Sequence, residues 1–477
     1  MQIMKSFTKI LLICLMALSF QPAFGQIEKE QLVGSWLGTL DVSSMSLRLV
    51  FNISLTDEDS LKASLYSPDQ GERRIPMGQV SLKGDSLKIE APMIQGSYVG
   101  KFTSSTSIQG EWSQPGGTFD LNMEKQAGAF VLNRPQEPKP PFPYKVEEIN
   151  FNQIAQGFTL AGTLTLPEGQ GPFPAVVMVT GSGSQNRNEE IFGHKPFWVI
   201  ADHLTRSGIA VLRYDDRGVA ASGGMATGST TADLALDARS AMEYLLTRSE
   251  IDKSGLGIIG HSEGGMIAFM LASEYDDISF VVSLAGPGVD GKTILLEQSE
   301  YISRLSGVSE SIVEDNRIVM DKVYDLMIVN DTHKTWGEEV IKFTSSYYSN
   351  KKEGLYSEED IEQAKRNLLA SIPESSYAWM RYFVMYDPTS DFASIDCPVL
   401  ALNGAKDCQV LAEKNINAIK KGFQASGNKQ LTSMILPGLN HLFQNCKTGL
   451  STEYNMIEET FDQNTLKLIS SWILQLK

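Results

Sequence analysis

One pentapeptide constrains the fold of this chain more than any other feature. The sequence GHSEG at residues 260–264 directly follows the short apolar run 256–259, which is typical of a buried strand, and leads into the helical pattern of 266–272. A serine between a strand and a helix takes an unfavourable backbone conformation, and small residues on either side let the two elements approach. Its hydroxyl then lies at the amino end of the helix, whose dipole favours developing negative charge. The segment predicts that Ser262 is a nucleophile.

The predicted nucleophile needs a general base, and the chain has only five histidines. His441 lies in a loop just beyond the last predicted strand, 431–436. In folds with such a strand, turn and helix, the base follows the acid along the chain. The other histidines precede the nucleophile, lie in the pentapeptide or fall in a helical insertion: His194, His203, His261 and His333. We therefore predict His441 as the base.

The acid should orient this base and stabilise the imidazolium that forms as Ser262 loses its proton. Asp407 follows the predicted strand 399–402 and precedes a predicted helix. It is therefore expected at the carboxyl end of a strand, where open α/β sheets carry their active sites. Three alternatives precede that strand and are expected in solvated loops: Asp387, Asp391 and Asp396.

A tetrahedral intermediate also needs two backbone donors for its oxyanion. One is predicted to be the N–H of Glu263, directly after the nucleophile. The other should come from the glycine-rich loop 180–184, where we favour Ser182 and place Gly183 second. A phosphate-binding loop is the alternative, but no Gly-Lys-Ser/Thr follows this segment.

Strands and helices alternate after residue 144, which predicts an α/β fold whose mostly parallel sheet is covered on both faces. The run 175–179 is apolar throughout, as expected for a strand buried on both faces. The alternation stops over 289–388, and this mainly helical insertion is predicted to form a cap. We assign this domain to 146–477.

The residues before this domain have a different pattern. From 26 to 126 short alternating segments and turns predict a small antiparallel β-domain. Prolines crowd 135–143, so 127–145 is predicted to be a semi-rigid linker.

Residues 1–25 have the pattern of a secretory signal peptide: two lysines, an apolar run over 10–20 and the small-residue pattern Ala23-Phe24-Gly25. The run is too short to cross the roughly 30 Å of hydrocarbon in a bilayer. We therefore predict an exported protein, periplasmic or secreted, with no membrane span after cleavage.

Removing this signal takes two lysines from 41 basic residues and leaves 39 against 57 acidic ones, a net charge of −18. Nucleic acid is not an expected partner, because neutralising phosphates requires a basic face.

The segment from 146 to 477 resembles the bacterial α/β-hydrolase esterases of the EstD type. The matching stretches are Gly181–Arg187, Arg213–Gly218, Gly260–Met266, Ala285–Gly288 and Asn440–Phe443. The resemblance implies a serine esterase that acts on short acyl esters, uses no cofactor or metal, and has the same three catalytic residues. Ala220-Ala221 departs from the family pattern, which leaves the substrate preference open. Three charged residues in this region are expected to hold loops by ion pairs: Arg213, Asp216 and Arg217.

Aromatic residues gather just before the sheet resumes, and a cap could use them as an apolar wall for the acyl group. They are Tyr377, Trp379, Tyr382, Phe383 and Tyr386. Packing in the core of the cap is the alternative, and the sequence does not choose between the two.

A disulfide is expected beside the active site. Cys408 directly follows Asp407, and Cys446 lies shortly after His441, so a working triad brings the two cysteines together. An oxidising compartment would let the bond form, leaving Cys397 free. The alternative is that all three are unpaired.

Two other functions are compatible with these motifs. Serine peptidases of the prolyl type share such a domain, but their selectivity rests on a large propeller that the short β-domain cannot build. A non-enzymatic binding protein would not need an intact Ser, Asp and His. We therefore predict an exported serine hydrolase that cleaves a small-molecule or glycan-linked carboxylic ester through an acyl-enzyme intermediate.

Overall fold

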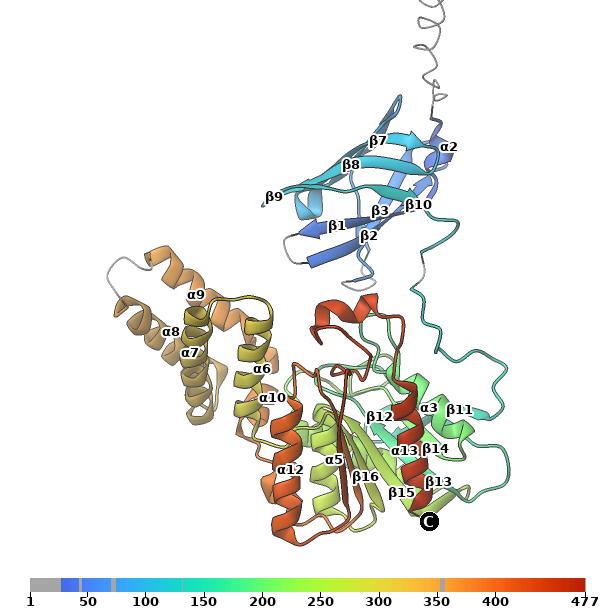
Figure 1. Ribbon diagram of the computed structural model, residues 1–477, viewed down its shortest axis with the longest axis vertical. Coiled ribbons are helices and arrows are strands. Elements are labelled where there is room, and N and C mark those ends of the chain that lie inside the picture. The colour runs from blue at the N-terminus through green and yellow to red at the C-terminus, as the bar shows by residue number, and fades with distance from the viewer. Residues whose placement is uncertain (1–26, 43–44, 70–73, 131, 352–356, 477) are drawn as a thin grey trace, which may run out of the picture. The chain divides into compact units, whose positions relative to one another are not determined.

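The computed structural model describes residues 27–42, 45–69, 74–130, 132–351 and 357–476. The predicted signal peptide lies outside these ranges. The chain divides into two compact units, Met1–Leu132 and Asn133–Lys477 (Figure 1). In the described ranges, none of the helices has the length and apolarity needed to cross a membrane.

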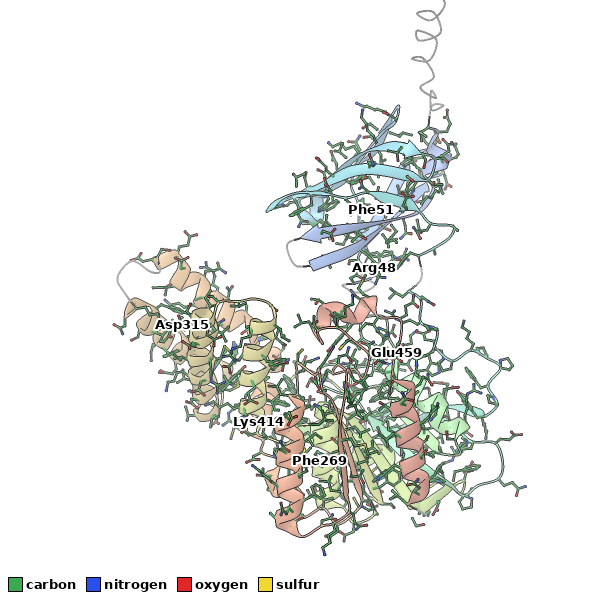
Figure 2. All side chains as sticks on the ribbon, viewed as in Figure 1. Arg48, Phe51, Phe269, Asp315, Lys414 and Glu459 are labelled. Atoms are coloured by element: carbon green, nitrogen blue, oxygen red, sulfur yellow. The ribbon has the colours of Figure 1, made fainter. Side chains whose placement is uncertain are left out.

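The N-terminal unit is an antiparallel sheet, as predicted. Its strand order is β4-β3-β2-β1-β10-β8-β7-β6-β5, with β9 paired to β8. Its interior holds two fully buried tryptophans, Trp36 and Trp112, together with Phe51 (Figure 2). The elements are α2 (Lys29–Leu32), β1 (Gly34–Val42), β2 (Met45–Leu55), β3 (Leu61–Tyr66), β4 (Ile75–Pro76), β5 (Val80–Lys83), β6 (Ser86–Ala91), η1 (Pro92–Ile94), β7 (Gly96–Ser104), β8 (Ser107–Gln114), β9 (Gly117–Asp120) and β10 (Met123–Lys125).

The segment predicted to be a linker differs from that expectation in its second half. The boundary between the units falls after Leu132, and the residues beyond it belong to the C-terminal unit. The Arg134 guanidinium donates to the carbonyls of Gly193 and Ile457 at 3.1 and 2.9 Å, and the Tyr144 hydroxyl donates to Asp202 at 2.7 Å. These side-chain bonds attach the proline-rich stretch to the unit, which composition alone did not indicate.

The C-terminal unit is built on an eight-stranded sheet in the order β11-β12-β14-β13-β15-β16-β17-β18. The first two strands are antiparallel, and β14 and the strands after it pair in parallel. The sheet is therefore mostly parallel, as predicted. The strands are β11 (Lys145–Asn152), β12 (Thr159–Leu166), β13 (Phe173–Val179), β14 (Ala210–Tyr214), β15 (Ile251–His261), β16 (Phe280–Leu284), β17 (Val399–Gly404) and β18 (Leu431–Leu436).

Helices cover both faces of this sheet, because each central strand sends apolar side chains in both directions. Val177 and Val179 of β13 pack with α4 (Thr231–Leu246), α5 (Glu263–Glu274) and α12 (Ala412–Ser426). Val176 and Met178 pack on the opposite face with α3 (Pro196–Arg206) and α13 (Gln463–Gln475). Phe269 of α5 is fully buried in the first of these layers (Figure 2). A short helix, η2 (Ser451–Met456), precedes α13.

Helices fill the insertion between β16 and β17, as expected for a cap (Figure 1). Except for the last one, they pack around the buried Trp336, whose indole N–H donates to the carbonyl of Val323 at 3.1 Å. An ion pair between Lys414 of α12 and Glu297 of α6 joins the insertion to the sheet layer. The helices are α6 (Gly291–Leu305), α7 (Glu310–Val329), α8 (His333–Ser349), α9 (Glu358–Ser371), α10 (Glu374–Met385) and α11 (Thr389–Phe392).

Candidate active site

Ser262 occupies the sharp turn that the pentapeptide predicted. It lies between β15 and α5 with φ 53° and ψ −119°, a conformation that L-residues rarely adopt. The flanking glycines make the turn possible: a Cβ on Gly260 would lie 1.9 Å from the carbonyl oxygen of Gly264, and a Cβ on Gly264 would lie 2.1 Å from that of Val179. Close packing of the backbone around the turn thus keeps Ser262 in this strained conformation.

His441 and Asp407 form a buried pair. Nδ1 of His441 lies 2.7 Å from Oδ2 of Asp407, and each residue is 3% exposed. The other carboxylate oxygen, Oδ1, accepts the backbone N–H groups of Gln409 and Val410 at 2.8 and 2.9 Å. These bonds fix the carboxylate, so the ring of His441 has a defined orientation.

The remaining histidines have other partners. His194 bonds Thr460 and the Tyr454 carbonyl, and burial lowers its pKa to about 4. The ring nitrogen Nε2 of His203 bonds Ser470, and that of His333 bonds the carbonyl of Ile372. His261 bonds a carboxylate that the sequence did not single out, Glu189.

Ser262 and His441 line one cavity of about 230 Å³. Asp407 does not line it and lies behind His441, to which it is bonded. The cavity is bounded by the loops after β13, β15 and β18 and by α6 and α10 of the insertion. Its walls are formed by Gly181, Ser182, Gln185, Glu189, Ile191, His261, Ser262, Pro287, Ile294, Leu295, Gln298, Trp379, Phe383, Gln409, Val410, His441 and Leu442.

The predicted oxyanion donors lie in different places. Ser182 lines this cavity, whereas Gly183 lines only a neighbouring one. Glu263 begins α5, so its N–H is at the amino end of that helix beside Ser262. Gly181 is close to Ser262 as well, since a Cβ there would lie 3.1 Å from Cβ of Ser262, but its N–H donates to Glu189.

The side chain of Glu263 is buried under the cavity. Oε1 accepts the hydroxyl of Thr231 at 2.6 Å and the indole N–H of Trp379 at 2.8 Å. Burial raises the pKa of this carboxyl, and hydrogen bonds from Thr231, Trp379 and Ser182 oppose that rise. The bond from Trp379 joins α10 of the cap to the residue directly after Ser262.

The predicted aromatic wall is realised only in part. Trp379 and Phe383 line the cavity, together with Ile294 and Leu295 of α6, which the sequence reasoning missed. Tyr382, the third candidate for the wall, does not line the cavity. Two more aromatics lie elsewhere: Tyr386 stacks on Tyr382, and Tyr377 packs in the cap core with its hydroxyl on the Asn330 carbonyl.

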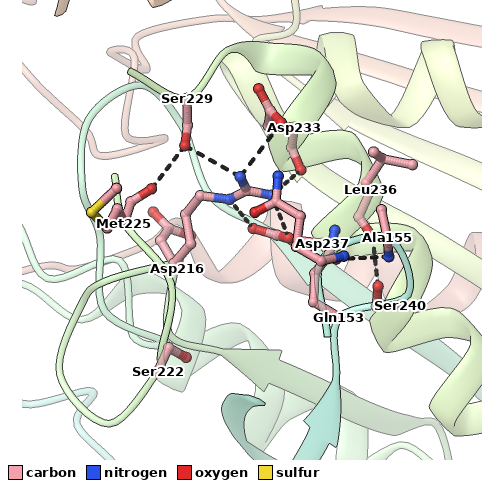
Figure 3. A network of polar contacts seen from close by, with 12 residues as sticks. Gln153, Ala155, Asp216, Ser222, Met225, Ser229, Asp233, Leu236, Asp237 and Ser240 are labelled. Carbon is pink, nitrogen blue, oxygen red and sulfur yellow. Dashed lines mark hydrogen bonds and ion pairs between the residues drawn. The ribbon is translucent and has the colours of Figure 1, made fainter. Parts of the chain in front are cut away.

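A second cavity of about 500 Å³ shares Ser182 and Trp379 with the first. Arg217 lies in its wall and donates to both carboxylate oxygens of Asp237, each at 2.7 Å (Figure 3). The expected loop-holding ion pair is thus present at Arg217. Asp216 instead accepts from Thr180 and from the Gln185 N–H. Arg213 donates to the amide oxygen of Asn188.

The predicted disulfide is not formed: Cys397, Cys408 and Cys446 are free thiols. The two loops do lie side by side, since the Lys406 ammonium donates to the carbonyl of Cys446 at 3.0 Å. Each thiol instead faces a backbone carbonyl, Cys408 that of Lys406 and Cys446 that of Gly438. Proximity of the loops did not determine the direction of the side chains.

Known proteins resemble this chain over the domain that carries the site. Esterase EstD of Thermotoga maritima is 26% identical over 317 residues, 66% of each protein, which confirms the predicted resemblance. Human mitochondrial acyl-coenzyme A thioesterase 2 is 31% identical over 128 residues, 26% of this chain and 23% of that enzyme. The chain thus matches just under two thirds of the first relative and about a quarter of the second. A solved esterase of Pyrococcus furiosus is 16% identical and covers 73% of this chain and 99% of its own, with a TM-score of 0.41.

A family model described as serine aminopeptidase, S33, matches residues 197–445, more than half of the chain. This match covers the nucleophile turn, the insertion and the loops of Asp407 and His441. The chain belongs to this serine aminopeptidase S33 family of the α/β-hydrolase fold.

Proposed function

We propose that this protein is a carboxylic-ester hydrolase that works through Ser262, His441 and Asp407. The observation that carries the proposal is the 2.7 Å bond between His441 and Asp407 at the cavity that also contains the strained Ser262. Similarity to esterase EstD supports an ester as the substrate.

The chemistry follows from the protonation of His441. Because Nδ1 is bonded to Asp407, Nε2 is the ring nitrogen that can accept the Ser262 proton. The serine oxygen adds to the ester carbonyl, the imidazolium returns the proton to the leaving alkoxide, and an acyl-enzyme remains. Water, deprotonated by His441, then adds to the acyl carbonyl; the bond to the Ser262 oxygen breaks, the imidazolium returns the proton to that oxygen, and the acid is released. The N–H groups of Glu263 and Ser182 are the donors we assign to the oxyanion.

The walls of the cavity support a short acyl group. Its volume of about 230 Å³ is below the roughly 300 to 1,000 Å³ of sites for drug-sized ligands. Trp379, Phe383, Ile294 and Leu295 give it an apolar side. The alcohol part, whether a small molecule or a glycan, would then extend toward solvent. The signal-like pattern of residues 1–25 supports action outside the cytoplasm.

Peptide hydrolysis is the second candidate, because the matching family model is described as a serine aminopeptidase. The same residues would cleave an amide by the same steps. Comparing an aminoacyl-naphthylamide with p-nitrophenyl acetate separates the two: faster turnover of the amide would reverse our assignment.

The main test compares acetyl, butyryl, octanoyl and feruloyl esters on the mature chain and on two variants. Ser262→Ala should abolish hydrolysis and labelling by a fluorophosphonate. Ser273→Ala, on the same helix with its hydroxyl bonded to the Met270 carbonyl, is the matched control and should keep both. Labelling that persists in Ser262→Ala would end the proposal, and absence of labelling in the wild type would favour a binding protein.

A further inference from the structure

A second histidine and carboxylate pair lies directly behind the proposed triad. Nδ1 of His261 lies 2.9 Å from Oε1 of Glu189, and Nε2 lies 2.9 Å from the backbone oxygen of His441. The rings of His261 and His441 are 4.7 Å apart between centroids. His261 and Glu189 are 6% and 3% exposed, so water competes little for these bonds.

The partners of His261 define which of its nitrogens carry protons. A backbone carbonyl only accepts, so Nε2 donates to the oxygen of His441. With Glu189 as a carboxylate, Nδ1 donates as well, and the ring is an imidazolium. Burial acts to lower the pKa of His261, but the charge of Glu189 and the hydrogen bonds to Glu189 and the His441 carbonyl outweigh it, so this pKa is raised.

One oxygen atom joins the loops of the site. Oε1 of Glu189 also accepts the N–H of Gly181 at 2.8 Å, directly before the proposed oxyanion donor Ser182. Three donors thus converge on two acceptors: the Gly181 N–H and Nδ1 of His261 on Glu189, and Nε2 of His261 on the His441 carbonyl. These donors and acceptors belong to three segments: Gly181 and Glu189 to the loop after β13, His261 to the turn before Ser262, and His441 to the loop after β18.

We propose that Glu189 and His261 form a buried charged pair that positions the oxyanion loop, Ser262 and His441 relative to one another. The pair acts through the backbone of these loops and takes no part in proton transfer, so both are positioning residues. This inference rests on the proposed esterase function.

The test replaces the charge and keeps the shape. In Glu189→Gln the amide oxygen can still accept, but His261 becomes neutral and one ring nitrogen loses its proton, so at least one of the three bonds is lost. We expect kcat to fall about 10- to 100-fold, as for a lost hydrogen bond to a charged group, with KM for p-nitrophenyl acetate nearly unchanged. The neighbouring Glu190 is exposed, and Glu190→Gln is the control that should behave like wild type.

Rates are expressed per active site titrated with a fluorophosphonate, because a merely structural role would lower the folded fraction and leave kcat per site unchanged. Equal kcat per site in Glu189→Gln and Glu190→Gln would overturn the proposal.

If Glu189→Gln does not fold, NMR spectra of the wild-type protein with ¹⁵N-labelled histidine test the proposal instead. We expect one imidazole that keeps both nitrogens protonated to a higher pH than the other histidines and whose signal is lost in His261→Gln; its absence in the wild type contradicts the pair. A wild type without ester hydrolysis would refute the proposed function and leave this spectrum interpretable.

Discussion

Asp407→Asn should silence the enzyme while leaving it folded, and the hydrogen bonds of Asp407 give the reason. The two carboxylate oxygens have different partners: Oδ1 accepts two backbone N–H groups at 2.8 and 2.9 Å, and Oδ2 lies 2.7 Å from Nδ1 of His441. An asparagine has one acceptor oxygen and one donor NH₂ group, so it can accept hydrogen bonds on only one of these two sides. Turning the nitrogen toward the backbone would leave two buried N–H groups unpaired, at about 1 to 3 kcal/mol each.

The oxygen of the new asparagine should therefore stay with the backbone, and its NH₂ should donate to Nδ1 of His441. The imidazole proton then moves to Nε2, so the ring can no longer accept the proton of Ser262. In a serine protease with this geometry the wrong tautomer lowers kcat about 10⁴-fold, which corresponds to about 5 kcal/mol of transition-state stabilisation. We expect a loss of this size here.

Hydrolysis of p-nitrophenyl acetate measures the loss, and thermal unfolding followed by circular dichroism shows whether the fold is kept. The control is Asp396→Asn, because Asp396 is an exposed aspartate before β17 that does not line the cavity. A folded Asp407→Asn protein that kept a tenth or more of the wild-type kcat would refute the assignment of the acid.

Three further predictions concern the residues around the site. Burial raises the pKa of Asp216 to about 7, against about 3.9 in an unfolded chain. The folded state therefore binds an extra proton between these values, and wild-type stability falls as pH rises from 4 to 7. The free energy of unfolding of Asp216→Asn, measured with urea, should rise relative to that of wild type by roughly 2 to 4 kcal/mol between pH 4 and pH 8. Parallel curves of this free energy against pH would contradict the prediction. Gly264→Ala should destabilise the fold by about 3 kcal/mol or more, because its Cβ would meet the backbone oxygen of Val179 at 2.1 Å; a soluble, fully active variant would disprove this. Trp379→Phe keeps an aromatic wall but removes the 2.8 Å bond to Glu263, so the free energy of unfolding should drop by about 1 to 2 kcal/mol, and an unchanged melting temperature would count against it.

Local patterns were enough to select the residues that we propose carry the chemistry. A strand, a glycine-flanked serine and a helix are contiguous in the sequence, so the strained turn at Ser262 follows from short-range backbone sterics. His441 and Asp407 follow from the order of strands in a parallel sheet, because the carboxyl ends of neighbouring strands meet at one edge. The alternation of strands and helices, the helical insertion and the antiparallel N-terminal unit were predictable for the same reason.

Only the tertiary structure decided how side chains meet across distant loops. Glu189 lies in a loop with no periodic pattern, and no spacing rule indicates that its carboxylate meets His261 and the N–H of Gly181. Tyr382 belongs to the predicted aromatic group but does not line the cavity, and the thiols of Cys408 and Cys446 face carbonyls although their loops are adjacent. The sequence determines which elements form and in what order, because propensity and hydrophobic period act locally. Which polar groups pair depends on packing directions between segments far apart in the chain, and these exist only once the chain has folded.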